Sequence, residues 1–177
     1  MREYQKVPFL AAADASGEPL ETSQDGRSPE VIVDVLESMV VSLERLISDR
    51  SADELQQAAR DGGWGAVELL AHMRDWEEIS RERVRRMLEE DPPVLEEHDD
   101  SLWAIEHDYG TQDGHEAVRQ FADLRRSLVE RLRNLDDDEW QRTAVLPSDG
   151  EITLMWLMSN LTRQDGRHLD QIREALG

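Results

Sequence analysis

The chain has 177 residues, a formal net charge of −20 and no cysteine. This length suits a single domain with a substantial core, and the negative charge argues against nucleic acid and anionic membrane surfaces as partners, because both require a basic face. Without cysteine the chain has no disulfides, thiolate nucleophiles or sulfur-ligated metals, so a metal site must use His, Asp, Glu, Gln or water.

The first segment, residues 1–27, mixes Gly, Pro, Ser and charged residues without periodicity and is expected to form an N-terminal arm or leader. Its apolar part, VPFLAAA, is short and contains a proline, which makes it a poor secretory signal. No apolar run approaches the roughly 20 residues of a membrane-spanning helix. We therefore expect a cytoplasmic location and a single domain formed by residues 28–177.

Two helices are predicted next. Ser28 can cap the first, Pro29 suits its first position, and apolar residues follow at steps of three and four. They are Ile32, Leu36, Met39, Leu43 and Leu46. The second helix is expected to begin after Gly65, with Glu68 as half of a capping box, and to end before Pro92.

A long acidic connection, residues 91–114, follows and is expected to contain one short helix around Trp103. Asp113 is the predicted cap of a third helix, residues 147–150 form a turn, and Thr153 caps a fourth helix. No strand is predicted, although RTAVLP has the composition of a brief extended segment. The sequence therefore predicts an all-α, four-helix bundle of up-down-down-up type with a long connection between helices 2 and 3.

Two histidines stand out in this arrangement. Helical geometry places His72 about a quarter-turn from the centre of its apolar stripe, near the rim, where a side chain can reach a cleft. Taken alone, a rim histidine is more often the partner of a nearby carboxylate than a metal ligand. His168 lies near the middle of the last helix's stripe, and Gln164 precedes it by one turn. These three side chains can satisfy one another across the bundle, or share a water or an ion.

Three segments of the chain together resemble a known family. They are WGAVELLAHMRDWE, FADLRRSLVERLRNL and DGEITLMWLMSNLTRQDGRHLDQIREAL. The family that they resemble is the DinB-like superfamily of bacterial four-helix proteins, and the resemblance covers residues 28–177. The resemblance implies a divalent metal, often zinc or nickel, held by a second-helix histidine that matches His72 and by a histidine pair on the last helix. His168 matches the later member of that pair, but Gln164 stands at the position of the earlier one. Asp165 keeps the acidic position of the motif.

Gln164 offers a neutral carbonyl oxygen, a poor donor for zinc or nickel, so the resemblance leaves the metal open. The carboxylates that remain as candidate ligands are Glu68, Asp75 and Asp165. The other residues predicted to border the pocket are Trp76, Trp103, Tyr109 and Arg125. For Arg125 the alternatives are a substrate carboxylate and an ordinary surface ion pair. The remaining histidines, His98, His107 and His115, are expected to be solvated.

The resemblance implies a metal-dependent enzyme of the thiol-transferase or hydrolase type, with a small molecule such as a low-molecular-weight thiol as its partner. The alternative is a catalytically silent bundle without tightly bound metal, which binds a small ligand or acts as a scaffold. Members of the family are often dimers, so a homodimer is a further expectation.

Overall fold

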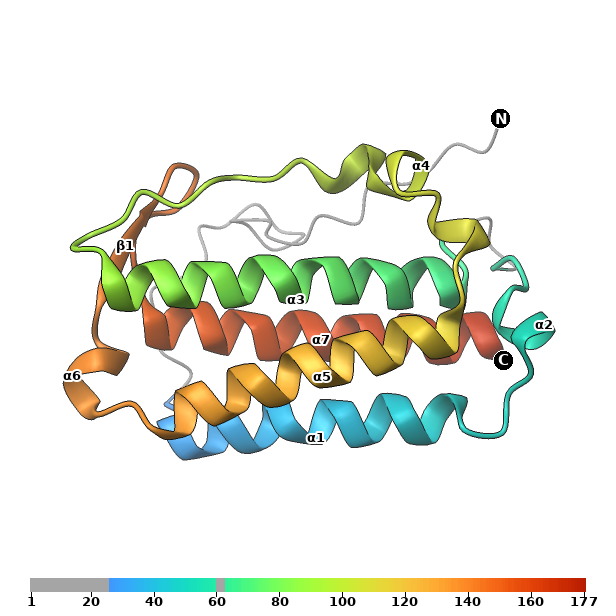
Figure 1. Cartoon of the computed structure of the whole chain (residues 1–177), viewed down its shortest axis with the longest axis horizontal. Coiled ribbons are helices and arrows are strands. Elements are labelled where there is room, and N and C mark those ends of the chain that lie inside the picture. Colours follow the sequence, from blue (N-terminus) through green and yellow to red (C-terminus); the bar gives the residue numbers. More distant parts are fainter. Residues whose placement is uncertain (1–25, 60–62) are drawn as a thin grey trace.

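In the computed structural model, which describes residues 26–59 and 63–177, four long helices lie alongside one another. They are α1 (Pro29–Ile47), α3 (Ala66–Glu89), α5 (Gly114–Arg133) and α7 (Leu154–Leu176). In Figure 1, α1 and α7 run in one direction while α3 and α5 run in the other. The predicted all-α bundle of up-down-down-up type is therefore confirmed. Of the predicted N-terminal arm, residues 1–25 lie outside the described residues.

The predicted helix starts are also found. The Gly65 N–H donates to Glu68 Oε2 at 2.7 Å at the start of α3, which uses one of the N–H groups that a helix leaves without a partner. Asp113 accepts from N–H groups in the first turn of α5, and the Thr153 hydroxyl accepts from the Trp156 N–H in α7 at 3.1 Å. Ser28 occupies the N-cap position of α1, although its side chain makes no capping hydrogen bond.

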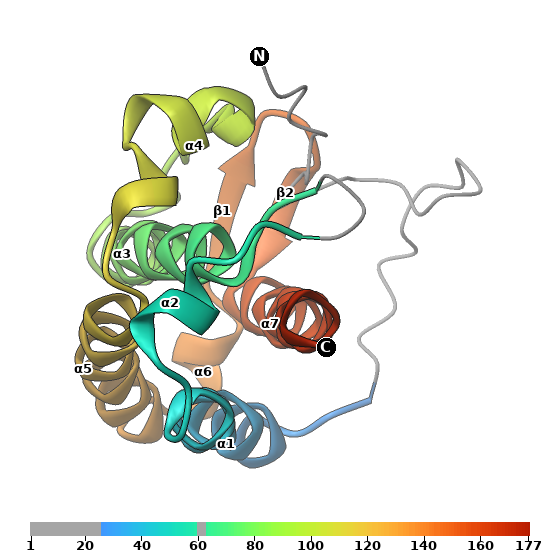
Figure 2. The same ribbon diagram turned by 90° about the vertical axis from the view of Figure 1, so that its right-hand side faces the viewer.

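The apolar stripes meet inside the bundle and form a core that runs along its length. All four long helices contribute, and the most completely buried residues include Ile32, Leu36, Leu43, Met87 and Ile172. The end-on view in Figure 2 shows the four helices around this interior, with the α4 region outside α3. No helix in the described ranges is both long and apolar enough to cross a membrane.

The long connection between α3 and α5 lies against the outside of α3. It contains η1 (Asp100–Leu102), α4 (Trp103–Glu106) and η2 (Tyr109–Thr111), of which α4 is the predicted short helix around Trp103. It carries the chain back along the full length of α3, as Figure 1 shows. For this reason α5 starts at the same end of the bundle as α3 and runs parallel to it. A further short helix, α2 (Ala52–Leu55), lies between α1 and α3.

A small hairpin follows α6 (Asp137–Trp140), which the sequence did not predict as a paired structure. β1 (Thr143–Leu146) pairs antiparallel with β2 (Gly150–Thr153), with Ala144 opposite Ile152. β1 also bonds to the long connection, because the Val145 N–H donates to the Pro93 carbonyl at 2.9 Å. Pairing between two such short segments depends on these tertiary contacts, which periodicity does not reveal.

Candidate functional site

His72 is fully buried, with an exposed fraction of 0%. The sequence placed His72 at the rim of the apolar stripe of its helix, whereas in the structure the long connection covers this side of α3 and buries the ring. The His72 ring centroid lies 6.5 Å from that of Trp103 in α4 and 6.4 Å from that of Tyr109 in η2. The connection thus turns a rim position into an interior one.

His168 faces His72 from α7, and their ring centroids are 5.2 Å apart. Its Nδ1 lies 2.9 Å from Gln171 Oε1. Because that oxygen can only accept, Nδ1 carries the proton and Nε2 presents a lone pair. Within the described part of the chain this buried Nε2 has no hydrogen-bond partner. A ring held by a bond at one nitrogen and open at the other is the usual state of a metal-ligating histidine.

The surroundings hold both imidazoles neutral. Burial and, to a smaller extent, the neighbouring His168 together lower the pKa of His72 to about 2. Burial also lowers the pKa of His168, against the opposing effects of Gln171 and Asp165. Neutral imidazole is the form that ligates a metal.

A third donor is less well defined. Gln164 is buried, at 3% exposure, one turn before His168 on α7. On the other side of the pair, Asp100 Oδ2 lies 3.7 Å from His72 Nε2 and accepts a hydrogen bond from Trp76 Nε1 at 3.1 Å. Across the described residues, no three His, Asp or Glu side chains are close enough together to hold an ion as they stand. The candidate ligands in this pocket are therefore two imidazole nitrogens, with oxygen donors nearby.

Aromatic rings close the pocket around His72. The nearest is Trp64, just before α3, whose ring centroid lies 4.8 Å from that of His72, and Trp76 lies at 6.3 Å. The predicted wall residues Trp76, Trp103 and Tyr109 therefore do surround His72. Sequence reasoning missed Trp64 and Asp100 as pocket residues. Trp64 was visible only as part of a motif, and Asp100 lies in a segment without periodicity.

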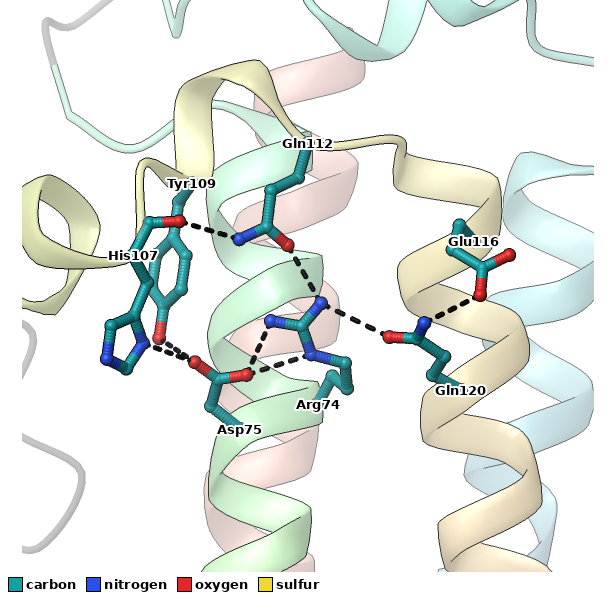
Figure 3. A network of polar contacts seen from close by, with 7 residues as sticks. All are labelled: Arg74, Asp75, His107, Tyr109, Gln112, Glu116 and Gln120. Atoms are coloured by element: carbon teal, nitrogen blue, oxygen red, sulfur yellow. Dashed lines mark hydrogen bonds and ion pairs between the residues drawn. The ribbon is translucent and has the colours of Figure 1, made fainter.

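Asp75, which the sequence offered as a candidate metal ligand, instead accepts hydrogen bonds from residues outside the histidine pair. Its Oδ2 accepts from Tyr109 Oη at 2.7 Å and from His107 Nδ1 at 2.6 Å, and its Oδ1 accepts from Arg74 Nη2 at 2.5 Å. Figure 3 shows this network, which continues through Gln112 to the end of the connection. Asp75 therefore fastens the connection to α3, and His107, predicted to be solvated, takes part although its side chain is 43% exposed.

Asp165 and Glu68, the other candidate carboxylates, also have partners. Asp165 Oδ2 accepts from Arg125 Nη1 at 2.6 Å, and Glu68 caps α3. Arg125 is not at the surface, as an ordinary ion pair would require, but has an exposed fraction of 0%. Its Nε and Nη2 donate to the two oxygens of Glu77 at 2.9 and 2.7 Å. Burial works against its charge, but Asp165 and Glu77 outweigh burial and raise the pKa of Arg125.

Comparison with known proteins agrees with this architecture. Residues 36–172 match the profile of the DinB superfamily. The Bacillus subtilis protein named "Putative metal-dependent hydrolase YfiT" is 26% identical over 120 residues, which covers 68% of this chain and 67% of the relative. The Halalkalibacterium halodurans protein named "Putative metal-dependent hydrolase BH0277" is 28% identical over 145 residues, or 80% of this chain and 78% of the relative.

Two solved structures share the fold. The structure of YfiT from Bacillus subtilis, described as a four-helix bundle of unusual topology, superposes with a TM-score of 0.79 and 24% identity, covering 89% of this chain and 90% of that one. A mycothiol-dependent maleylpyruvate isomerase superposes with a TM-score of 0.69 and 11% identity, covering 85% of this chain and 62% of that one. With the family profile matching most of its length, this chain belongs to the DinB superfamily.

Proposed function

We propose that the pocket between α3 and α7 binds a divalent metal ion, such as zinc or nickel, through His72 and His168. The observation that carries this proposal is the buried Nε2 of His168, which has no hydrogen-bond partner among the described residues while Nδ1 is held by Gln171. A buried polar atom without a partner is costly, and a metal ion would remove that cost.

The remaining positions around the ion would be filled by oxygen. Asp100 is the best-placed carboxylate, because its Oδ2 lies 3.7 Å from His72 Nε2. Only a small movement would be needed for this oxygen and the His72 nitrogen to hold the same ion. Gln164 would contribute a weak carbonyl ligand or orient the substrate. Asp75 and Asp165 stay with their present partners in this proposal.

The reaction class that we favour is hydrolysis, because the curated relatives carry that description. A divalent metal would supply Lewis acidity to such a reaction. The residues of the chain itself would shape the site: Trp64, Trp76 and Trp103 shield it from solvent and contact the apolar part of a small substrate. Transfer of a low-molecular-weight thiol is the second candidate, supported by the mycothiol-dependent enzyme that shares the fold.

A bundle that binds a small ligand without metal, or acts as a dimeric scaffold, is the candidate from another class. Two observations favour it: an amide stands at position 164, and no three His, Asp or Glu side chains in the described ranges are gathered around one point. Metal content separates this candidate from the metalloenzyme.

The test is the metal content of protein purified without a histidine tag, after zinc or nickel supplementation. We expect about one ion per chain, lost in His72→Ala and in His168→Ala. His115→Ala is the matched control, because His115 lies outside the pocket and its Nε2 contacts the Arg50 carbonyl at 3.0 Å. Asp100→Asn should weaken binding without abolishing it.

The contrary result is unmodified protein that contains no metal while Gln164→His takes it up strongly. That outcome would show a pocket able to bind metal only with a third imidazole, and it would support the scaffold. If metal is bound, turnover of ester, amide and thiol substrates then distinguishes hydrolysis from thiol transfer.

A further inference from the structure

A cavity lies along α3, away from the two histidines. It has a volume of about 290 Å³ and lies between the C-terminal half of α3 and residues 95–98 of the connection. Ile79 and Leu95 provide its apolar lining, and Arg83 borders it as well. Arg83 follows His72 by eleven residues, or about 16 Å along a helix that rises 1.5 Å per residue. None of the residues that line the cavity is among those around the two histidines, although His98 of the cavity contacts the Trp76 and Trp103 rings.

Arg83 is a buried cation without a matching anion. Its exposed fraction is 5%. Its Nη2 donates to the Glu96 carbonyl at 2.8 Å, whereas its buried Nε has no hydrogen-bond partner in the described ranges. Among those residues no carboxylate oxygen lies within 4.0 Å of the guanidinium. Buried arginines are normally paired, as Arg125 is with two carboxylates.

Other nearby groups stabilise the buried positive charge of Arg83 only in part. The guanidinium carbon lies 5.5 Å from the centroid of the Trp76 ring, which gives a cation–π contact. Burial lowers the pKa of Arg83 to about 10, although Glu97 and Asp149 act in the opposite direction from a distance. A buried arginine without a carboxylate in ion-pair contact destabilises the protein unless a bound anion neutralises its charge.

We propose that this cavity binds a small organic acid, whose carboxylate pairs with the Arg83 guanidinium while its apolar body contacts Ile79 and Leu95. A planar guanidinium pairs well with the two oxygens of a carboxylate. Three glutamates (Glu78, Glu82 and Glu96) and one further cation, Arg86, also line the cavity, so its lining carries a net negative charge and a single negative charge on the ligand suits it better than a phosphate dianion. The proposal is independent of metal binding at the histidine pocket.

The test uses benzoate and hexanoate as probes, with benzamide and hexanamide as neutral counterparts of the same shape. Binding is measured on the full chain by calorimetry, and by tryptophan fluorescence because Trp76 adjoins Arg83. We expect each acid to bind at least ten times more tightly than its amide. Inorganic phosphate should bind no better than the amides.

Arg83→Gln should remove the preference for the acids. Arg81→Gln is the matched control, because Arg81 is on the same helix but turns toward α5, where its Nη2 contacts Ser127 Oγ at 3.3 Å. It should retain the preference. Acids that bind no more tightly than their amides, a preference that survives Arg83→Gln, or phosphate that binds as well as benzoate would each overturn the proposal.

A second variant tests whether Arg83→Gln loses its preference for acids only because the protein no longer folds. Arg83→Met keeps the length of the side chain and removes the charge. If Arg83 serves a ligand, this variant should raise the Tm of the ligand-free protein by about 2–4 °C, since the unpaired charge disappears. If Arg83 is instead a structural residue, its Tm should fall, and the proposal fails.

Discussion

At the scale of single residues, burial decides what the two pocket histidines can do. His72 and His168 are interior residues next to each other, and burial is the largest cause of the lowered pKa of each. Both rings are therefore neutral at physiological pH and can act as ligands. Had the connection left His72 at the rim, its ring would be solvated and free to take up a proton.

A pH dependence of stability follows for the metal-free protein. The pKa of His72 is about 2 in the folded chain, against about 6.5 when unfolded, so below pH 6.5 the unfolded state binds more protons. Stability should therefore fall with acid, by about 1.4 kcal/mol per pH unit well below 6.5, with the loss continuing toward pH 2. Urea unfolding between pH 7 and 5, in chelator, measures it. His72→Gln should flatten this dependence, and an unchanged slope would contradict the assignment.

At the scale of elements, the connection between α3 and α5 makes the pocket. α3 and α7 bring the two histidines together, but η1, α4 and η2 supply Asp100, Trp103 and Tyr109. The network around Asp75 holds this cover in place at one end (Figure 3). Pairing of the Pro93–Leu95 backbone with β1 holds it at the other end. A chain with the same helices but a short second loop would lack the site.

Tyr109→Phe tests this attachment, because it removes one hydroxyl and keeps the ring. The lost hydrogen bond goes to a charged carboxylate at 2.7 Å, so we expect a loss of about 1.5–3 kcal/mol of unfolding free energy. Hydrogen exchange over residues 100–111 should accelerate. Thr111→Val is the control, because Thr111 bonds only to the neighbouring Asp108. Equal exchange in both variants would show that Asp75 does not fasten the connection.

At the scale of the whole molecule, Arg125 joins all four bundle helices. From α5 it bonds to Glu77 on α3, to Asp165 on α7 and, through Nη1 at 3.3 Å, to the Leu36 carbonyl on α1. A buried network of this kind adds less to stability than its number of bonds implies, because each charge is desolvated. Removal of Arg125, however, would leave the carboxylates of Glu77 and Asp165 as buried charges without a partner.

Arg125→Met should therefore destabilise the protein by about 3–5 kcal/mol, because it leaves Glu77 and Asp165 buried without a cation. Chemical denaturation measures the loss. Arg126→Met is the matched control, since Arg126 is adjacent in sequence with a side chain 55% exposed, and it should change stability by no more than about 0.5 kcal/mol. Similar effects for the two variants would rule out a special role for the buried network.

The sequence alone was sufficient to predict the bundle and to single out the two histidines of the candidate site. Apolar residues at steps of three and four identify the four helices, and the caps at Gly65, Asp113 and Thr153 place their starts, because these signals are local. The same periodicity places His168 near the middle of the apolar stripe of its helix and His72 at the rim of its own. It also places Gln164 one turn from His168.

Only the tertiary structure decided how deeply His72 is buried and which carboxylate each cation meets. Asp75, Asp165 and Glu68 were all candidate ligands in the sequence, and the fold gives each a different partner. Asp100 approaches His72 from a segment without periodicity. These outcomes depend on contacts between residues far apart in the chain. A local pattern shows which way a side chain faces on its own helix, but not what packs against that face.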